Sequence, residues 1–273
     1  MNNVIIAGAG RSGTSMLAGT LARGGYFIGT DYLPARDSNP KGFFEGREVN
    51  AINEGILESS LTAGQRLQQP ILRLARTLGL PWRSARALHR RGQAWLMPVP
   101  LSARIRGSAA IESQIRALTA QMPFCFKDPR FSYTLPVWRP FLDLERTVFL
   151  CVFRHPAETA ASIAKECRVQ PYLRGMEIPI RGLLELWRLM YGHILERQRQ
   201  HGRWLFIHYA QLLDKEYLPR LAAFTGAQID ADFPDAALHR SRPDIPLDAE
   251  TRNMYAELCN LAGFDQDSQR PAR

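Results

Sequence analysis

Short apolar runs alternate along this chain with longer stretches that repeat apolar residues at helical spacing. Four runs read as strands: Val4–Ala7, Phe124–Phe126, Thr147–Phe153 and Trp204–Ile207. Three stretches read as helices: Arg47–Ser60, Ala157–Cys167 and Gly182–Gln200. Short, continuous apolar runs are typical of strands that helices cover on both faces. The alternation predicts an α/β fold with a doubly wound, mostly parallel sheet and helices on both faces.

A glycine-rich loop follows the first strand. Gly8–Ser15 reads GAGRSGTS and fits the G-x-x-x-x-G frame of a phosphate loop (P-loop), but Thr14 replaces the lysine that kinases carry in this loop. A strand, a glycine turn and a helix start together aim backbone N–H groups at an anion. We expect the amides of Ser12, Gly13, Thr14 and Ser15 and the hydroxyls of Thr14 and Ser15 to hold a 5′-phosphate, with Arg11 adding a planar charge.

Polar clusters follow each of the four predicted strands directly. These clusters are Arg11–Ser15, Lys127–Arg130, Arg154–Pro156 and His208–Tyr209. Ligands of an open parallel sheet bind beyond the carboxyl ends of its strands, so the clusters should meet at one crevice. Pro156 is expected to open a helix that turns Ser162 back toward this crevice, where Arg154 and Ser162 can hold a second phosphate.

The loop GxxRSGTS and the Arg154…Ser162 pair resemble the 5′-phosphosulfate and 3′-phosphate motifs of sulfotransferases that use 3′-phosphoadenosine 5′-phosphosulfate (PAPS). Three further segments are similar to segments of that family. Cys125–Pro129 resembles its tyrosylprotein branch, Ile207–Leu213 its "RYExL" segment, and Asn39–Glu45 a segment of bacterial members. The resemblance covers Val4 to about Leu213.

The resemblance implies an enzyme that moves a sulfuryl group in line from PAPS to an acceptor hydroxyl of a tyrosine, saccharide, lipid or small molecule. It assigns Lys127 a catalytic role, places Tyr209 near the nucleotide and favours Glu45 as the base, with His155 as the competing choice. Family members also have a late basic loop on the 3′-phosphate, for which Arg240 and Arg242 are candidates.

The residues themselves fit this chemistry. Arg11 and Lys127 are a positive pair for the migrating group. A sulfuryl group carries less charge than a phosphoryl group, and Arg154 stands where a metal-supporting aspartate of a P-loop nucleotidase is expected, so no metal requirement is predicted. Two alternatives stay open: a small-molecule P-loop kinase, and a non-catalytic anion or membrane adaptor on a degenerate P-loop.

Charge is concentrated in one part of the chain. The formal net charge is +9, and residues 61–111 contain nine arginines and no acidic residue. We expect this segment to be an Arg-rich helical insertion or cap within a single domain of residues 1–273. It is a candidate contact for an acidic or lipidic acceptor or a membrane surface. Nucleic acid is not an expected partner, because no aromatic-studded or groove-reading motif accompanies the charge.

The cysteines and the hydropathy bear on location. Cys125, Cys151, Cys167 and Cys259 show no metal-binding spacing, which predicts reduced thiols. No apolar run reaches transmembrane length, and a first strand near Asn3 leaves no room for a signal peptide. The expectation is a cytoplasmic protein.

Overall fold

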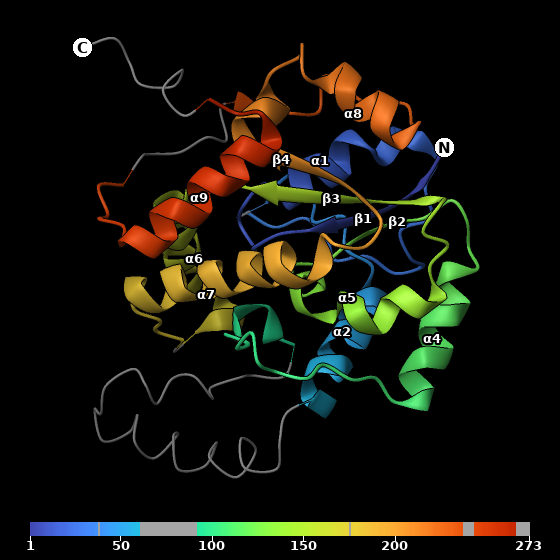
Figure 1. Cartoon of the computed structure of the whole chain (residues 1–273), viewed down its shortest axis with the longest axis horizontal. Helices are drawn as coiled ribbons and strands as arrows, with labels where there is room; N and C mark the ends of the chain where they lie inside the picture. The colour runs from blue at the N-terminus through green and yellow to red at the C-terminus, as the bar shows by residue number, and fades with distance from the viewer. Residues whose placement is uncertain (38, 61–91, 175, 237–242, 266–273) are drawn as a thin grey trace.

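The computed structural model describes residues 1–37, 39–60, 92–174, 176–236 and 243–265. Within them, four parallel strands form one sheet in the order β2-β1-β3-β4 (Figure 1). The strands are β1 (Asn3–Ala7), β2 (Cys125–Lys127), β3 (Thr147–Phe153) and β4 (Arg203–His208). All four predicted strands are confirmed, as is their parallel arrangement.

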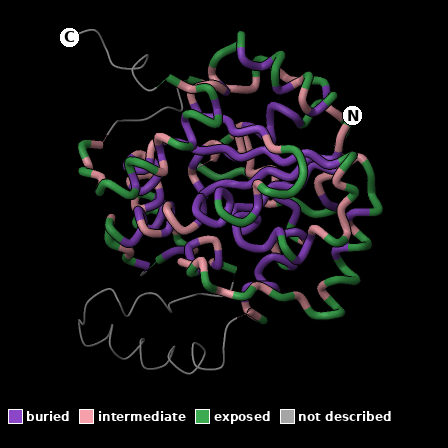
Figure 2. The backbone as a smooth tube through the Cα atoms, in the orientation of Figure 1, coloured by how far each residue is buried: buried purple, intermediate pink, exposed green. Residues whose placement is uncertain are grey.

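Both faces of the sheet are covered, so the strands lie at the centre of the buried core (Figure 2). Side chains alternate between the faces, because successive residues of a strand point to opposite sides. Val4 and Ile6 pack against α1 (Thr14–Thr20) and α8 (Leu218–Thr225), whereas Ile5 and Ala7 belong to the larger core on the opposite face. That larger core includes residues of α2 (Arg47–Ser60), α4 (Ala109–Thr119), α5 (Phe131–Trp138), α6 (Pro156–Val169), α7 (Ile180–His193) and α9 (Ala249–Ala262).

The predicted helices are present with small shifts. α2 has the predicted bounds, and α6 begins one residue early because Pro156 occupies its first turn. The predicted helix over 182–200 is α7 followed by one π-helical turn, η6 (Ile194–Gln198). Five 3-10 helices complete the described elements: η1 (Ala22–Gly24), η3 (Ala94–Leu96), η4 (Arg139–Phe141), η5 (Pro171–Leu173) and η7 (Tyr209–Leu213).

The strand order positions the site. β1 lies between β2 and β3, so the chain leaves β1 toward β2 on one side and later returns to β3 on the other. Because all four strands are parallel, the segments that follow them emerge at one edge of the sheet. The reversal of strand order beside β1 creates a crevice at that edge.

Only the end of the arginine-rich segment is described. Residues 61–91, which make up most of the predicted helical insertion, lie outside the described residues. From 92 to 108 the chain forms η3 and then irregular backbone, and α4 begins at Ala109. The helical insertion over 61–111 stays a prediction.

The cysteine and hydropathy predictions have structural counterparts. All four cysteines are buried free thiols. Burial raises the pKa of Cys125 to about 12 and that of Cys167 to about 11, which keeps both thiols protonated at neutral pH. No helix of the described ranges is long and apolar enough to cross a bilayer.

Candidate active site

A cleft of about 990 Å³ opens at the carboxyl edge of the sheet. Nine of the predicted site residues line it, from six separate segments of the chain: Arg11, Gly13, Thr14, Ser15, Glu45, Lys127, Arg154, Ser162 and Tyr209. The predicted convergence at one crevice is therefore present. Of the remaining predicted residues, Ser12 and His155 do not line the cleft, and Arg240 and Arg242 lie outside the described residues.

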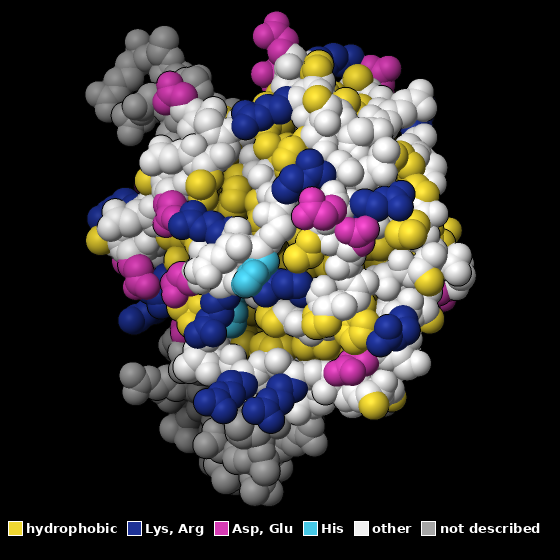
Figure 3. Space-filling model, turned by 45° about the vertical axis from the view of Figure 1, so that its right-hand side comes forward, with side chains coloured by type: hydrophobic (Ala, Val, Ile, Leu, Met, Phe, Trp, Pro, Cys, Tyr) yellow, Lys and Arg dark blue, Asp and Glu magenta, His cyan; other side chains and the backbone are white. Residues whose placement is uncertain are grey.

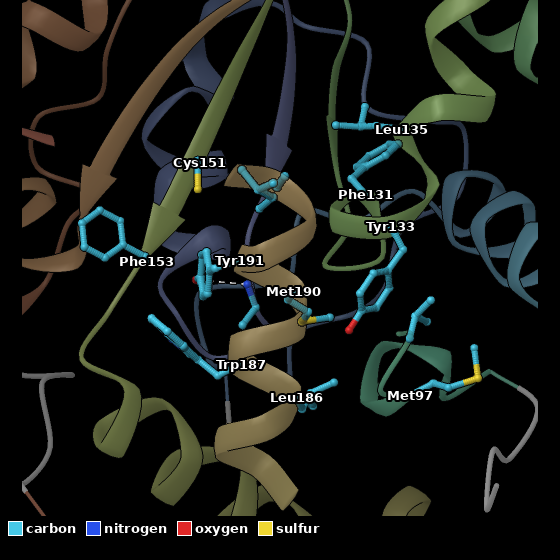
Figure 4. Close-up of a cluster of buried hydrophobic side chains, with 14 of the residues drawn as sticks. Met97, Phe131, Tyr133, Leu135, Cys151, Phe153, Leu186, Trp187, Met190 and Tyr191 are labelled. Atoms are coloured by element: carbon cyan, nitrogen blue, oxygen red, sulfur yellow. Dashed lines mark hydrogen bonds between the residues drawn. The ribbon is translucent and has the colours of Figure 1, made fainter. Parts of the chain in front are cut away.

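The loop after β1 is held tightly from behind. Gly8 has a φ of 136°, and a Cβ there would lie 2.2 Å from the carbonyl oxygen of Val152, so only glycine fits. Tyr191 reaches the loop from α7 (Figure 4): its hydroxyl accepts from the Ala9 amide at 3.1 Å and lies 2.8 Å from the Val152 carbonyl oxygen. Burial raises the pKa of Tyr191, so the hydroxyl keeps its proton.

Ser12 does not line the cleft, unlike its neighbours Arg11 and Gly13. Its hydroxyl lies 3.1 Å from that of Tyr191 and 3.4 Å from that of Thr159, and its amide donates to the Ala9 carbonyl at 3.3 Å. Both polar groups of Ser12 are thus engaged inside the protein. The side chain of Arg11, which has a φ of 68°, lines the cleft, whereas that of Ser12 does not. Contact of the Ser12 amide with a nucleotide stays a prediction.

The turn into α1 has an aromatic neighbour. Gly13 has a φ of 97°, and a Cβ there would lie 2.6 Å from Cδ2 of Tyr209, so the Tyr209 ring packs directly on the loop backbone. The guanidinium of Arg154 lies 4.8 Å from the centre of the same ring, and its Nε donates to Glu158 at 2.5 Å. Burial raises the pKa of Tyr209. Loop, ring and guanidinium form one continuous wall.

Arg11 and Ser162 meet across the cleft. Arg11 Nε donates to Ser162 Oγ at 3.3 Å, and an Arg11 terminal nitrogen lies 3.8 Å from the carboxylate of Glu166. Glu166 accepts at 2.9 Å from the hydroxyl of Tyr172, whose ring lies 4.6 Å from the Arg36 guanidinium. The contacts confirm that Ser162 faces the crevice from the second turn of α6, as predicted.

Lys127 and Glu45 form a buried ion pair in the middle of the cleft. The Lys127 side chain is 1% exposed, and its ammonium contacts the Glu45 carboxylate and donates to Ser15 Oγ at 3.1 Å. The other Glu45 oxygen accepts from Asn50 Nδ2 at 3.0 Å. The last residue of β2 and the end of the 39–45 segment are therefore joined directly above the loop.

The 39–45 segment is fixed at its other end as well. Lys41 donates to the Phe233 carbonyl at 2.7 Å and lies 3.3 Å from Asp235, and Phe44 packs edge-on against the Phe233 ring at 5.4 Å. These contacts hold the 39–45 segment in the position that brings Glu45 to Lys127 and the loop.

His155 is placed by packing instead. It precedes the first residue of α6, and its ring lies edge-on to Tyr255 at 5.0 Å. Since it does not line the cleft, its position does not favour it as a base.

A second buried charge cluster, which sequence reasoning missed, borders the cleft beside Lys127. Arg130 donates to Asp128 at 3.0 Å and lies 2.7 Å from Glu54, and its other terminal nitrogen donates to the Gly92 carbonyl at 3.0 Å. Glu54 accepts from the amides of Gly92 at 2.7 Å and Ala94 at 3.1 Å. Burial raises the pKa of Asp128, and the Arg130 guanidinium opposes that rise.

This cluster holds in place the backbone next to Trp95, whose ring forms one wall of the cleft. It anchors the backbone at Gly92 and Ala94, just before Trp95, whose ring lies so close to the loop that a Cβ at Gly10 would be 2.7 Å from it. The signal in the sequence was the spacing of Glu54 to Arg47 and Asn50, which places all three on one face of α2.

One face of the molecule is mixed in charge (Figure 3). On the face that Figure 3 shows, Lys and Arg side chains lie singly or in small groups among apolar and uncharged ones. Within the described ranges, no group of three or more His, Cys, Asp and Glu side chains is arranged to hold a metal ion.

Comparisons with known proteins bear on the fold. No protein-family model matches this chain, and no curated protein matches its sequence. Among solved structures, it is similar to one described as "Sulfotransferase Domain from the Curacin Biosynthetic Pathway", with a TM-score of 0.50 and 15% identity. The alignment covers 97% of this chain and 98% of that one. The chain therefore shares the overall fold of that domain.

Proposed function

We propose that this protein is a sulfotransferase that takes a sulfuryl group from PAPS and transfers it to an acceptor hydroxyl. The observation that carries the proposal is the meeting of Arg11, Lys127 and Arg154 in one cleft with a P-loop that lacks lysine. The similarity of fold to a sulfotransferase domain supports the same reaction class.

The cleft residues fit a nucleotide with two separate phosphate groups. The hydroxyls of Thr14 and Ser15 would hold the 5′-phosphate. Backbone amides at the start of α1 would help, since the first helical bond there runs only from the Leu17 N–H to the Gly13 carbonyl, at 3.1 Å. Arg154 and Ser162 would hold the 3′-phosphate, since the pair with Glu158 uses only Nε of Arg154 and leaves the two terminal nitrogens of its planar fork. Tyr209 would border the adenosine.

Bound PAPS would supply an activated sulfuryl group. Arg11 and Lys127 are the cations that stabilise the negative charge developing on its oxygens. Glu45 is the base that takes the proton of the acceptor hydroxyl. The acceptor must compete with Lys127 for the Glu45 carboxylate, so acceptor binding frees the ammonium for the transferred group. The ion pair thus keeps base and cation in place before the acceptor arrives.

The same residues give weaker support to the alternative that the protein is a P-loop kinase. Asp128 is the one acidic residue directly after β2, but its carboxylate accepts from the side chain and amide of Arg130 and does not line the cleft. Arg154 follows β3 where a metal-holding aspartate would be needed. An adaptor without catalysis would not require the pairing of Glu45 with Lys127.

Ligand-induced thermal stabilisation tests the proposal. Adenosine 3′,5′-bisphosphate in the presence of EDTA should raise the Tm, since a ligand at 100 times its Kd stabilises by about 2.7 kcal/mol. ATP with Mg²⁺ should have the smaller effect. Arg154→Gln should lose most of the response, whereas Arg181→Gln, an exposed arginine on α7 that does not line the cleft, should keep it. An unchanged Tm with bisphosphate would refute the proposal, and a preference for ATP with Mg²⁺ would favour a kinase.

A further inference from the structure

A second groove lies outside the cleft, beside residues 102–106 of the arginine-rich segment. It has a volume of about 450 Å³, and residues 102–106, α5, α7 and η6 line it. It shares no lining residue with the cleft. None of its described lining residues is acidic, whereas three are arginines: Arg104, Arg106 and Arg197.

The segment that carries two of these arginines is fixed at both ends. His193 Nε2 lies 3.1 Å from the Val99 carbonyl oxygen and 3.2 Å from that of Pro100, which joins the segment to α7. At its other end, the Arg106 amide donates to Ser60 Oγ at 2.9 Å. The backbone is therefore held in place while the Arg104 and Arg106 side chains extend from it.

The arginines form a rim of positive charge. Arg104, Arg106 and Arg197 are all exposed, and all three line the groove. Within the described residues, none of the three guanidinium groups has a salt bridge. The described lining of the groove contains these three arginines and no acidic side chain, so positive charge predominates in it.

The floor of the groove offers a buried donor. Gln198 is 1% exposed, its Oε1 accepts from Arg139 at 2.6 Å, and its Nε2 has no hydrogen-bond partner. A buried amide donor without a partner is costly, because the group has lost its water. An anion that enters the groove could accept from Nε2 while the rim arginines neutralise it.

We propose that this groove is a binding site for a phosphoryl-type anion, held by Arg104, Arg106 and Arg197 and by the Gln198 amide. The site is separate from the proposed donor site and does not depend on the proposed transfer reaction. The chemistry fits both a soluble phosphate ester and the phosphomonoester headgroup of a lipid. The proposed transfer reaction does not use the arginine-rich segment. Anion binding in this groove would give the described residues of that segment a role.

Calorimetric titration with inorganic pyrophosphate tests the soluble source. The wild-type protein should show a site that persists in Arg154→Gln and is lost in the double variant Arg104→Gln/Arg197→Gln, with a Kd raised at least about tenfold for each charge-assisted bond removed. Gln198→Glu, which keeps an oxygen for Arg139 but puts a carboxylate in the floor, should also lose it. Arg181→Gln is the control for net charge and should bind as wild type.

Flotation with phosphatidylcholine vesicles, with and without phosphatidate, tests the lipid source. Binding that requires phosphatidate and is lost in Arg104→Gln/Arg197→Gln but kept in Arg181→Gln supports the groove with a lipid ligand. Overturning results are equally specific. The proposal fails if neither probe distinguishes the double variant from wild type, if Gln198→Glu binds normally, or if Arg181→Gln weakens binding as much as the groove variants do.

Discussion

Glu45→Gln is the change that most directly tests the ion pair at the centre of the cleft. Glutamine keeps the size of the side chain and an oxygen for Asn50, but it removes the negative charge next to Lys127. The Lys127 ammonium, whose side chain is 1% exposed, would then be a buried charge with a neutral partner and the Ser15 hydroxyl.

The magnitude follows from this burial. Two unit charges about 4 Å apart interact by about 4 kcal/mol at an effective dielectric constant near 20. Removing one partner of a buried pair costs about 3–5 kcal/mol, because the other charge stays behind without its water. For a chain of this size, a loss of about 3 kcal/mol lowers the Tm by about 6–12 °C. Lys127→Met should cost a similar amount.

Urea unfolding of wild type, both single variants and the double variant Glu45→Gln/Lys127→Met forms a double-mutant cycle. We expect the double variant to lose much less than the sum of the single losses, since neither charge is then left alone. Strict additivity, or a loss below about 0.5 kcal/mol in Glu45→Gln, would refute the buried pair. In the same variant, transfer should fall by at least about a hundredfold while bisphosphate binding persists, because the base is lost but the phosphate contacts are not.

Three further changes test other parts of the structure. Gly13→Ala should destabilise by about 2–4 kcal/mol in urea unfolding, through αL strain and the clash with Tyr209, and should weaken bisphosphate binding, whereas intact binding would contradict the packed wall. Glu54→Gln should loosen the 92–94 backbone, and acrylamide should then quench Trp95 more strongly, as judged by difference from a Trp95→Phe background; unchanged quenching would exclude the anchoring role. The cap bond to the start of α9 lowers the pKa of Asp248, so its contribution is present above the unfolded pKa of about 4 and is lost as the pH falls through the lower folded pKa. Asp248→Ala should cost about 1 kcal/mol at pH 7, and this difference should shrink toward pH 2; a constant difference would contradict the cap.

The sheet and the meeting of its strand ends could be predicted from the sequence. The strands were readable because β1 and β3 are buried on both faces and so are continuously apolar. The convergence of the polar segments after the strands then followed from the parallel arrangement alone. By contrast, α5 was missed because Pro136 and a run of aromatic residues hide its periodicity, although the helix is almost fully buried.

The details of the site depend on contacts that spacing does not encode. Ser12 belongs to the same loop motif as Thr14, yet it follows Arg11, which is in the αL conformation, and the Ser12 hydroxyl lies against Tyr191. Tyr191 is 179 residues away from Ser12 in the sequence. The Glu54–Arg130 pair joins α2 to the segment after β2, and each residue alone reads as an ordinary surface charge. Such long-range pairs require the fold before they can be recognised.

Gly10 is shared by both halves of the cleft. Its lack of a side chain lets the Trp95 ring rest on the loop that would hold the nucleotide phosphate, so no spacer separates the two walls. A ligand that shifts Trp95 must therefore change the contacts of the loop. By thermodynamic reciprocity, a ligand bound to the loop must change the affinity of the Trp95 side of the cleft for its own ligand to the same degree. Changes at this tryptophan would consequently alter the order and cooperativity with which two substrates bind, beyond any effect on the fit of either one.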